Sequence, residues 1–222
     1  MLARMADHGE HEAVRRSYDT VAEEYAQRLH DELDAKPLER ALLSCLVERA
    51  EPGAPVADLG CGPGHVAAHL TGLGVRAVGV DLSAAMVATG RARYPQVEFR
   101  EGDLLNLPAE DGEFGAAVAL YTIIHLDPHE LLPAFVEARR VLRPSGLLLV
   151  SFHIGTEIRH LDEWWGHDVN LDFRFLAVPD IAGLLEVAGF AVEARLEREP
   201  APGEAQTRRA YLLARTPESA RL

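Results

Sequence analysis

The segment Val56–His65 constrains the fold of this chain more than any other part of its sequence. It reads Val-Ala-Asp-Leu-Gly-Cys-Gly-Pro-Gly-His, so an apolar stretch typical of a buried strand runs directly into three glycines at alternate positions. Glycine lets a backbone turn sharply and approach a ligand at a place where a Cβ atom would collide. The pattern predicts a strand, a tight turn that faces a ligand, and a following helix.

The spacing of these glycines argues against a nicotinamide-dependent oxidoreductase. The fingerprint of dinucleotide-binding folds is G-x-G-x-x-G, which places a pyrophosphate at the start of a helix. Here the glycines are Gly60, Gly62 and Gly64, and His65 stands where the fingerprint requires its third glycine. An enzyme that binds NAD through this loop is therefore a disfavoured alternative.

Short apolar runs and helical patterns alternate along most of the chain, after two expected helices at about 10–30 and 37–50. Repeated strand-helix units with apolar strands favour a parallel sheet that is covered by helices on both faces. We expect strands at 56–59, 76–80, 97–100, 114–121 and 147–152, and helices at 64–73, 83–93 and 128–142.

The pattern changes after residue 152. Residues 153–177 are rich in His, Trp, Asp and Arg without a clear period, and we expect them to form an insertion or a lid. A helix at about 179–188 and strands at 190–198 and 209–215 follow, and the turn-rich segment between these strands predicts a hairpin. We expect one domain over residues 1–222, made of a helical cap (10–50), a core (54–152), the insertion (153–177) and a closing helix with two strands (178–215).

Charge and composition limit the partners of the chain. The 222 residues carry a formal net charge of −13, which disfavours nucleic acid because phosphate backbones are bound mainly through Lys and Arg. No apolar run reaches the roughly 18 residues of a membrane helix, and Met1–Glu12 lacks the apolar core of a signal peptide. We expect a cytoplasmic protein, monomer or homodimer, without a membrane partner. Cys45 and Cys61 lack the spacing of a metal or disulfide site, so no metal is expected.

Asp58 and the three glycines give the spacing D-x-G-x-G-x-G, which resembles motif I of the class I S-adenosylmethionine-dependent methyltransferases. The resemblance covers about residues 14–215 and includes Arg140–Gly146, which is similar to a turn common in the family before the fifth strand. It implies an α/β, Rossmann-like, mostly parallel sheet of seven strands in the order 3-2-1-4-5-7-6, with strand 7 antiparallel, helices on both faces and an N-terminal helical cap. It also implies S-adenosylmethionine as cofactor and S-adenosylhomocysteine as product.

The resemblance implies roles for side chains that follow successive strands. Asp58 matches the acid that helps hold the methionine ammonium group of the cofactor. Asp81 would accept hydrogen bonds from both ribose hydroxyls, or would only cap the helix that follows it. Asp103 matches the acid that meets the adenine amino group, or is a turn aspartate. The expected cofactor contacts are Tyr25, Asp58, Gly60, Cys61, Gly62, Gly64, Asp81, Leu82, Met86, Asp103, Leu104, Leu120 and Tyr121.

Two of the ten histidines, His125 and His153, are the catalytic candidates. Both follow expected strands at the edge of the sheet where open α/β folds bind ligands. Histidine has an ordinary pKa of about 6.5 and is the side chain best suited to take a proton from a hydroxyl at neutral pH. The alternative for each is a simple wall residue. His11, by contrast, is expected at the surface.

Both tryptophans of the chain, Trp164 and Trp165, fall in the expected insertion. Large aromatic side chains in a segment that interrupts the regular fold favour a lid or pocket wall over core packing. Arg174 could pair with an acidic acceptor or with Asp172. The expected substrate-binding residues are Tyr18, His125, His153, Trp164, Trp165 and Arg174.

These observations predict direct methyl transfer to a small-molecule acceptor, with O-methylation favoured because a histidine could take a hydroxyl proton. Two alternatives stay open. One is a methyltransferase that acts on RNA or protein, and the other is a protein that binds the cofactor without catalysis.

Overall fold

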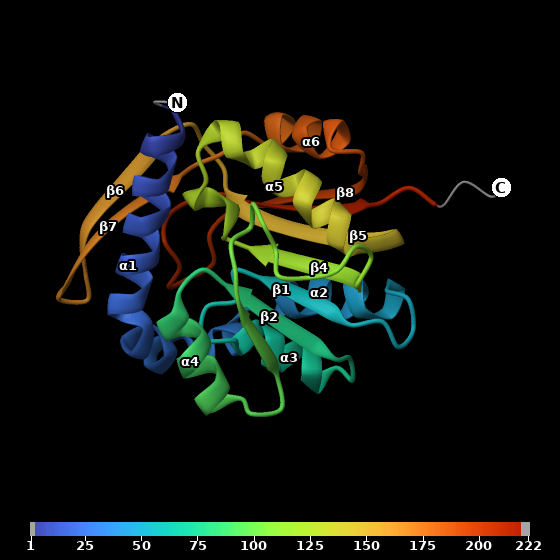
Figure 1. Cartoon of the computed structure of the whole chain (residues 1–222), viewed down its shortest axis with the longest axis horizontal. Helices are drawn as coiled ribbons and strands as arrows, with labels where there is room; N and C mark the ends of the chain where they lie inside the picture. The colour runs from blue at the N-terminus through green and yellow to red at the C-terminus, as the bar shows by residue number, and fades with distance from the viewer. Residues whose placement is uncertain (1–2, 219–222) are drawn as a thin grey trace.

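The computed structural model describes residues 3–218, with side chains from residue 11 onward. Its centre is a seven-stranded sheet in the order β3-β2-β1-β4-β5-β9-β8, and β6 and β7 form a separate pair (Figure 1). The described strands are β1 (Val56–Leu59), β2 (Ala77–Asp81), β3 (Glu98–Glu101), β4 (Phe114–Leu120), β5 (Leu142–His153), β6 (Ile158–Trp164), β7 (His167–Arg174), β8 (Ala191–Arg198) and β9 (Arg209–Arg215).

The topology confirms the predicted sheet. Strands β1 to β5 pair in parallel, whereas β9 runs antiparallel to both β5 and β8. The sixth and seventh strands expected from the sequence are therefore β8 and β9, and the expected hairpin joins them. Parallel order brings the carboxyl ends of β1, β2, β4 and β5 to one edge of the sheet, where open α/β folds bind ligands.

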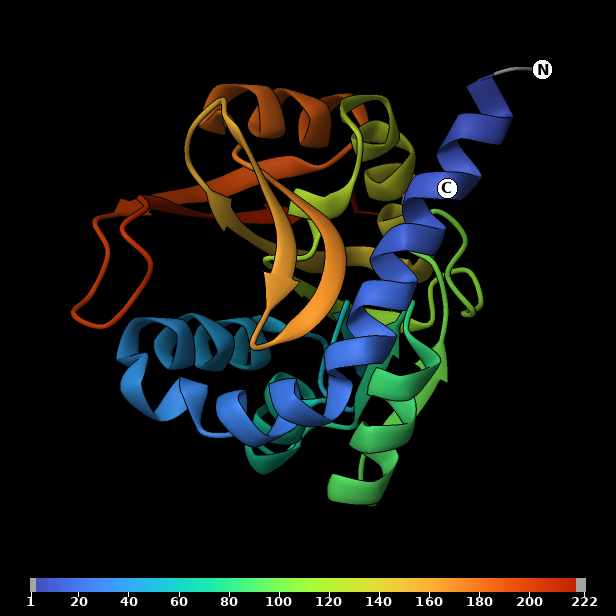
Figure 2. The ribbon, with the colours of Figure 1, turned by 90° about the vertical axis from the view of Figure 1, so that its left-hand side faces the viewer.

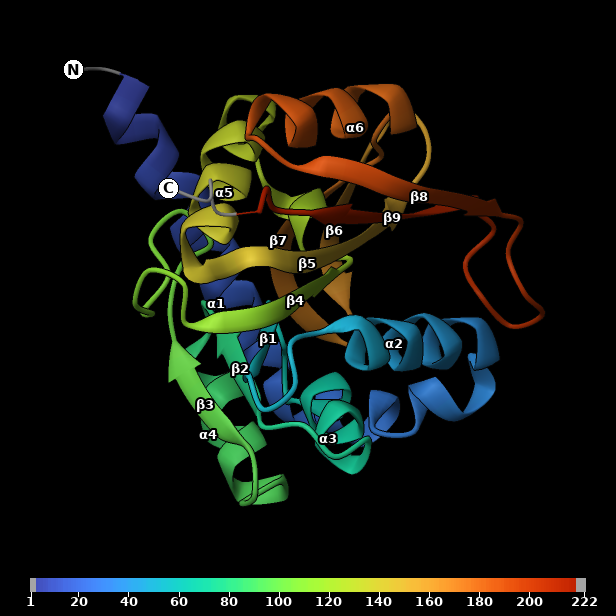
Figure 3. The ribbon, with the colours of Figure 1, turned by 90° about the vertical axis from the view of Figure 1, so that its right-hand side faces the viewer.

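Helices cover both faces of this sheet. Figures 1 and 3 show α2, α3 and α4 on one face and α5 and α6 on the other. All four residues of β1 are buried, as a strand between two helical layers requires. The described helices are α1 (Ala3–Leu29), α2 (Pro37–Arg49), α3 (His65–Gly72), α4 (Ala84–Arg93), α5 (Pro128–Val141) and α6 (Val178–Val187), with short 3-10 turns η1 (Glu32–Ala35) and η2 (Ile123–His125).

The expected insertion is a regular antiparallel hairpin made of β6 and β7. Its turn is Trp165–Gly166, in which both residues have positive φ angles (54° and 84°), as the tightest hairpin turns require. The sequence shows no clear period there because most of β6 is exposed and Leu171 is the one residue of β7 that is buried. The sequence therefore predicted an insertion here without predicting its two strands.

The hairpin and α1 together cover the carboxyl edge of the sheet (Figure 2). They are joined through Ser17, whose hydroxyl accepts a hydrogen bond from the backbone N–H of Asn170 at 2.8 Å. Helix α1 also packs against α4, so it bridges the hairpin and the first half of the sheet. Among residues 3–218, no helix combines the length and the apolar character that a membrane span requires.

Candidate functional site

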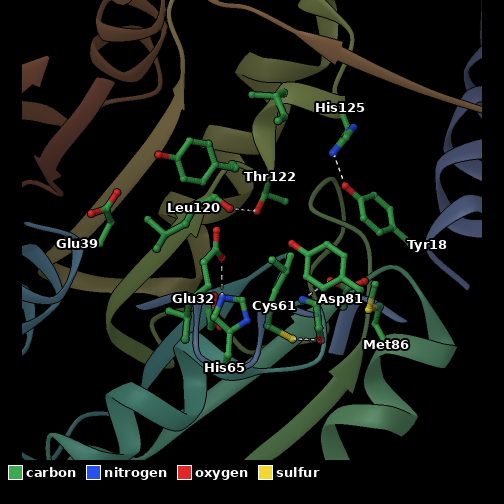
Figure 4. A pocket seen from close by; sticks show the side chains of 18 of the residues that line it. Tyr18, Glu32, Glu39, Cys61, His65, Asp81, Met86, Leu120, Thr122 and His125 are labelled. Atoms are coloured by element: carbon green, nitrogen blue, oxygen red, sulfur yellow. Dashed lines mark hydrogen bonds and ion pairs between the residues drawn. The ribbon is translucent and has the colours of Figure 1, made fainter. Parts of the chain in front are cut away.

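A cavity of about 820 Å³ lies at the carboxyl edge of the sheet, beneath α1 and the hairpin (Figure 4). Residues 201–205, in the loop between β8 and β9, also line the cavity. Gly64, Trp165 and Arg174 do not line the cavity. The predicted site residues that do line it are Tyr18, Tyr25, Asp58, Gly60, Cys61, Gly62, Asp81, Leu82, Met86, Asp103, Leu104, Leu120, Tyr121, His125, His153 and Trp164.

The three glycines after β1 have different reasons to be glycine. All have positive φ angles, of 71°, 52° and 88°. A Cβ atom on Gly60 would lie 2.1 Å from the Thr122 side chain, and one on Gly64 would lie 2.3 Å from the Phe99 ring. A Cβ atom on Gly62 would meet only the Tyr25 ring, at 3.8 Å. Gly60 and Gly64 therefore serve internal packing, and Gly62 is the glycine that keeps the cavity open to a ligand.

Asp58 is a buried carboxylate at the end of β1. Its Oδ2 atom has no hydrogen-bond partner among the residues that the structure describes. Burial raises the pKa of Asp58 to about 7, because the ionised form loses its water and gains little in return. A cationic donor in the cavity would supply the missing partner and stabilise the charged form.

Asp81, at the end of β2, holds the glycine turn in place. Its Oδ2 accepts from the N–H of Gly62 at 2.7 Å, and its Oδ1 accepts from the N–H of Ser83 at 2.9 Å. Ser83 itself caps α4, since its hydroxyl accepts from the N–H of Met86. Burial raises the pKa of Asp81 to about 6 in spite of these bonds. Asp81 is therefore a second buried carboxylate facing the same cavity.

His11 is partly buried and joins α1 to Asp103, the residue predicted to meet the adenine of the cofactor. Its Nδ1 lies 3.0 Å from Asp103 and its Nε2 lies 2.9 Å from Glu130. The hydrogen bond to Asp103, together with Glu130, raises the pKa of His11 to about 9. The expectation that His11 lies at the surface was wrong, because the contact spans 92 positions of sequence and leaves no local pattern.

His125 is held in a defined tautomer by two neighbours. Its Nδ1 donates to the backbone carbonyl of Asp172 at 3.0 Å, so its Nε2 accepts from the Tyr18 hydroxyl at 2.7 Å. Burial lowers the pKa of His125 to about 4. Figure 4 shows Tyr18 and His125 directed toward one another at the cavity wall. The lone pair that a general base needs is thus already engaged by Tyr18.

His153, the second catalytic candidate, is packed between rings. Its ring centroid lies 5.0 Å from that of Tyr121 and 5.4 Å from that of Phe175, and its Nδ1 lies 2.8 Å from the Thr207 hydroxyl. Burial lowers the pKa of His153 to about 4. His153 is therefore neutral at physiological pH and forms part of an aromatic wall.

The two tryptophans have different surroundings. Trp164 lines the cavity and packs edge-on against Tyr18 and Tyr25, with ring centroids at 6.1 and 5.7 Å. Trp165 stacks on Trp164 from outside the cavity and lies under the guanidinium of Arg28.

Arg174 lies outside the cavity as well. It pairs with Asp127 at the start of α5. Its expected alternative partner, Asp172, pairs instead with His160 at 2.8 Å.

The sequence analysis did not predict a buried polar network beside the cavity, formed by Glu39, Tyr211 and Arg198. Glu39 of α2 is only 3% exposed, accepts a hydrogen bond from the Tyr211 hydroxyl, and pairs with Arg198 at 2.7 Å. One signal was present, because Glu39 shares a helical face with Leu43 and Leu46, both buried. A carboxylate on an apolar helical face indicates a buried partner.

Comparisons with known proteins agree with this geometry. A family model described as "Methyltransferase domain" matches residues 56–146. A probable S-adenosylmethionine-dependent methyltransferase of Mycolicibacterium smegmatis is 37% identical over 145 residues, which cover 64% of this chain and 53% of that protein. The 2-phytyl-1,4-naphtoquinone methyltransferase of Trichormus variabilis is 30% identical over 163 residues, which cover 68% of each chain. The chain belongs to the S-adenosylmethionine-dependent methyltransferase family.

Solved structures of the family support the fold. The 1,6-didemethyltoxoflavin-N1-methyltransferase of Burkholderia thailandensis, with bound 1,6-didemethyltoxoflavin and S-adenosylhomocysteine, superposes with a TM-score of 0.74 at 20% identity and covers 96% of this chain and 91% of its own. The present chain spans about half the length of the first curated relatives that it matches.

The residues present fit the family cofactor, S-adenosylmethionine. Asp58 offers a buried carboxylate oxygen that no described residue hydrogen-bonds, which suits an ammonium group. Gly62 leaves its side of the turn open, so a ligand can lie against the backbone there. Asp81 lines the same cavity. Burial raises the pKa of its carboxylate, so further hydrogen-bond donors from a ligand would stabilise the ionised form.

Proposed function

We propose that this protein transfers a methyl group from S-adenosylmethionine to an oxygen atom of a small-molecule acceptor. The observation that carries the proposal is that two sets of residues line the cavity. One set, the cofactor end, has the open glycine turn and two buried carboxylates, Asp58 and Asp81. The other set, the acceptor end, has aromatic walls that include Tyr18 and Trp164, which pack beside Met86. A charged cofactor and a flat, largely apolar acceptor fit these two adjoining sets.

At the first end, we propose that Asp58 binds the ammonium group of the cofactor and that Asp81 binds its ribose hydroxyls. Leu82 and Met86 would flank the ribose and adenine, and Asp103 would meet the adenine amino group. When bound, the cofactor supplies an electrophilic methyl group. Because the reaction is an in-line displacement, placement of the acceptor supplies much of the catalysis, up to about 7 to 11 kcal/mol.

At the second end, we propose that Tyr18, Trp164 and Phe173 position the acceptor and exclude water. The names of two similar proteins, 2-phytyl-1,4-naphtoquinone methyltransferase and 1,6-didemethyltoxoflavin-N1-methyltransferase, support a small-molecule acceptor. The net charge of −13 supports it too, because an acidic protein is poorly suited to bind RNA.

The test is to incubate the protein with methyl-labelled S-adenosylmethionine and an extract of its host, then to separate products by size. We expect label among small molecules, no label when excess S-adenosylhomocysteine is present, and almost none with the Asp81→Ala variant. Label on RNA or protein would overturn the small-molecule acceptor. S-adenosylhomocysteine binding without any transfer would indicate a non-catalytic cofactor-binding protein, and tight NADH binding would overturn the family cofactor for this chain.

A further inference from the structure

A chain of hydrogen bonds joins Tyr121 to the buried carboxylate of Glu39, and both of these residues line the cavity. The hydroxyl of Tyr121, which lines the cavity, lies 3.1 Å from the hydroxyl of Tyr211. The Tyr211 hydroxyl in turn hydrogen-bonds to the carboxylate of Glu39. The three residues come from the end of β4, from β9 and from α2, so only the folded protein brings them together.

The direction of these bonds follows from chemistry. A carboxylate can only accept, so the Tyr211 hydroxyl donates its proton to Glu39. Tyr211 also accepts from Arg198 Nε at 3.1 Å, and its remaining lone pair accepts from Tyr121. Tyr121 therefore donates inward, and the lone pairs of its oxygen remain for a donor in the cavity. An acceptor hydroxyl is such a donor.

The backbone at Tyr121 supports a functional role. Its φ angle is 55°, a left-handed conformation that is rare for a bulky side chain and strained by about 1 to 3 kcal/mol. Its N–H bonds to the backbone carbonyl and hydroxyl of Ser151, which fix this conformation. The next residue, Thr122, packs against Gly60, so the Tyr121 backbone lies close to the glycine turn at the predicted cofactor end.

Charged and titratable groups pack around Tyr121, Tyr211 and Glu39. Arg198 bonds to Glu39 and Tyr211, while Glu204 bonds in turn to Arg198 at 2.6 Å. Lys36 lies 5.6 Å above the Tyr121 ring, and Arg209 lies close enough to act on it electrostatically. His153 packs against the same ring as a neutral imidazole. Burial raises the pKa of Tyr121 to about 12, so it remains a proton donor to Tyr211.

We propose that Tyr121, Tyr211 and Glu39 form a proton relay for the hydroxyl group that is methylated. The inference rests on the proposed function and deepens it. As the acceptor oxygen bonds to the methyl carbon, the sulfur–carbon bond breaks with its electron pair on sulfur. The acceptor proton passes to Tyr121, the Tyr121 proton to Tyr211, and the Tyr211 proton to Glu39, which becomes a neutral acid. The positive charge on sulfur and the negative charge on the carboxylate disappear together.

The relay changes the roles expected from the sequence. Tyr121 becomes the catalytic residue that touches the acceptor, and Tyr211 and Glu39 are positioning residues that act through it. The lone pair of His125 holds Tyr18, which leaves that histidine as part of the acceptor wall. A buried carboxylate thus takes the place of a histidine as final base.

The experiment uses 4-nitrophenol as probe, because its phenolate absorbs visible light and its ionisation can be read without turnover. The full-length protein is first saturated with S-adenosylhomocysteine, with binding confirmed by calorimetry, and then titrated with 4-nitrophenol across pH. Tyr121 accepts a hydrogen bond from the neutral phenol and the Glu39 carboxylate disfavours a second negative charge, so we expect the apparent pKa of bound 4-nitrophenol to rise by about one unit, a tenfold shift in its ionisation. Tyr211→Phe and Glu39→Gln should each return it toward the value in water.

Tyr94→Phe is the matched control, because Tyr94 lies outside the cavity lining and should leave the probe unchanged. Thermal unfolding by circular dichroism shows that each variant is folded. An unshifted apparent pKa in the wild type, no difference in either relay variant, or no saturable probe binding would overturn the relay. Failure to bind S-adenosylhomocysteine would instead overturn the proposed function, so the two failures are distinguishable.

Discussion

The two ends of the cavity are built in different ways. The cofactor end comes mainly from residues at the ends of β1, β2 and β3 or just after them, within one stretch of about 50 positions, 56–104. The acceptor end gathers side chains from α1, η2, the β6–β7 hairpin and the β8–β9 loop. The first end is fixed by strand order, because parallel strands bring their carboxyl ends to one edge. The second depends on how added segments pack, so it can vary while the first stays constant.

The largest expected effect is loss of the cofactor end through Asp81→Ala. The variant removes the carboxylate proposed for the ribose and also releases the N–H groups of Gly62 and Ser83. Since hydrogen bonds to charged groups contribute about 1.5 to 3 kcal/mol each, we expect at least a hundredfold loss in affinity for S-adenosylhomocysteine. Calorimetry measures it. Glu101→Ala, an exposed acid at the end of the neighbouring strand β3, is the control, and equal losses in the two variants would contradict the assignment.

A smaller effect at the same end is a pH dependence of binding. Burial raises the pKa of Asp58 to about 7, so this carboxyl is protonated in part of the physiological range. An ammonium group favours the ionised form, so affinity for S-adenosylhomocysteine should rise with pH and be about tenfold weaker near pH 6 than near pH 8. Asp58→Asn should bind weakly and lose most of this dependence. An unchanged pH profile in Asp58→Asn would assign the dependence to another group.

The contrast between the two ends explains what the sequence could predict. The strand positions follow from local periodicity, whereas the strand order and the cofactor contacts follow from the resemblance to class I methyltransferases. The structure has this strand order and places nearly all of the expected cofactor contacts on the cavity. The contacts of Glu39 with Tyr211 and of His11 with Asp103 span 172 and 92 positions. Such contacts are set by tertiary packing, and a single sequence carries no local trace of the partner.

At the acceptor end, the two adjacent tryptophans offer a matched pair. Trp164 lines the cavity and Trp165 stacks behind it, although the sequence predicted both as substrate contacts. We expect Trp164→Ala to raise the KM for the acceptor about tenfold with little change in S-adenosylhomocysteine affinity, because a lost aromatic contact removes about 1.4 kcal/mol or more. Trp165→Ala should change the KM less than threefold. Steady-state kinetics with the identified acceptor measure both KM values. Equal increases in the two variants would contradict the assignment and show that the two tryptophans act together.

The smallest expected effect tests the link between the two ends, the His11 contact with Asp103 and Glu130. The pKa of His11 is raised from about 6.5 in the unfolded chain to about 9 in the folded protein. The protonated imidazole therefore stabilises the fold fully below about pH 6.5, and the contribution is lost as the pH rises through about 9. His11→Gln should cost about 1 kcal/mol in the free energy of unfolding near pH 7, allowing for solvent screening, and almost nothing near pH 10.

Urea unfolding of both proteins at the two pH values measures this difference. A cost that persists near pH 10 would mean that His11 contributes packing rather than charge. The same variant also tests how α1 is coupled to the cofactor end. In the wild type, His11 occupies the carboxylate that is proposed for the adenine amino group. His11→Gln should therefore leave S-adenosylhomocysteine affinity equal or slightly higher, and a clear loss would show that the ion pair orients Asp103 for the adenine instead of competing with it.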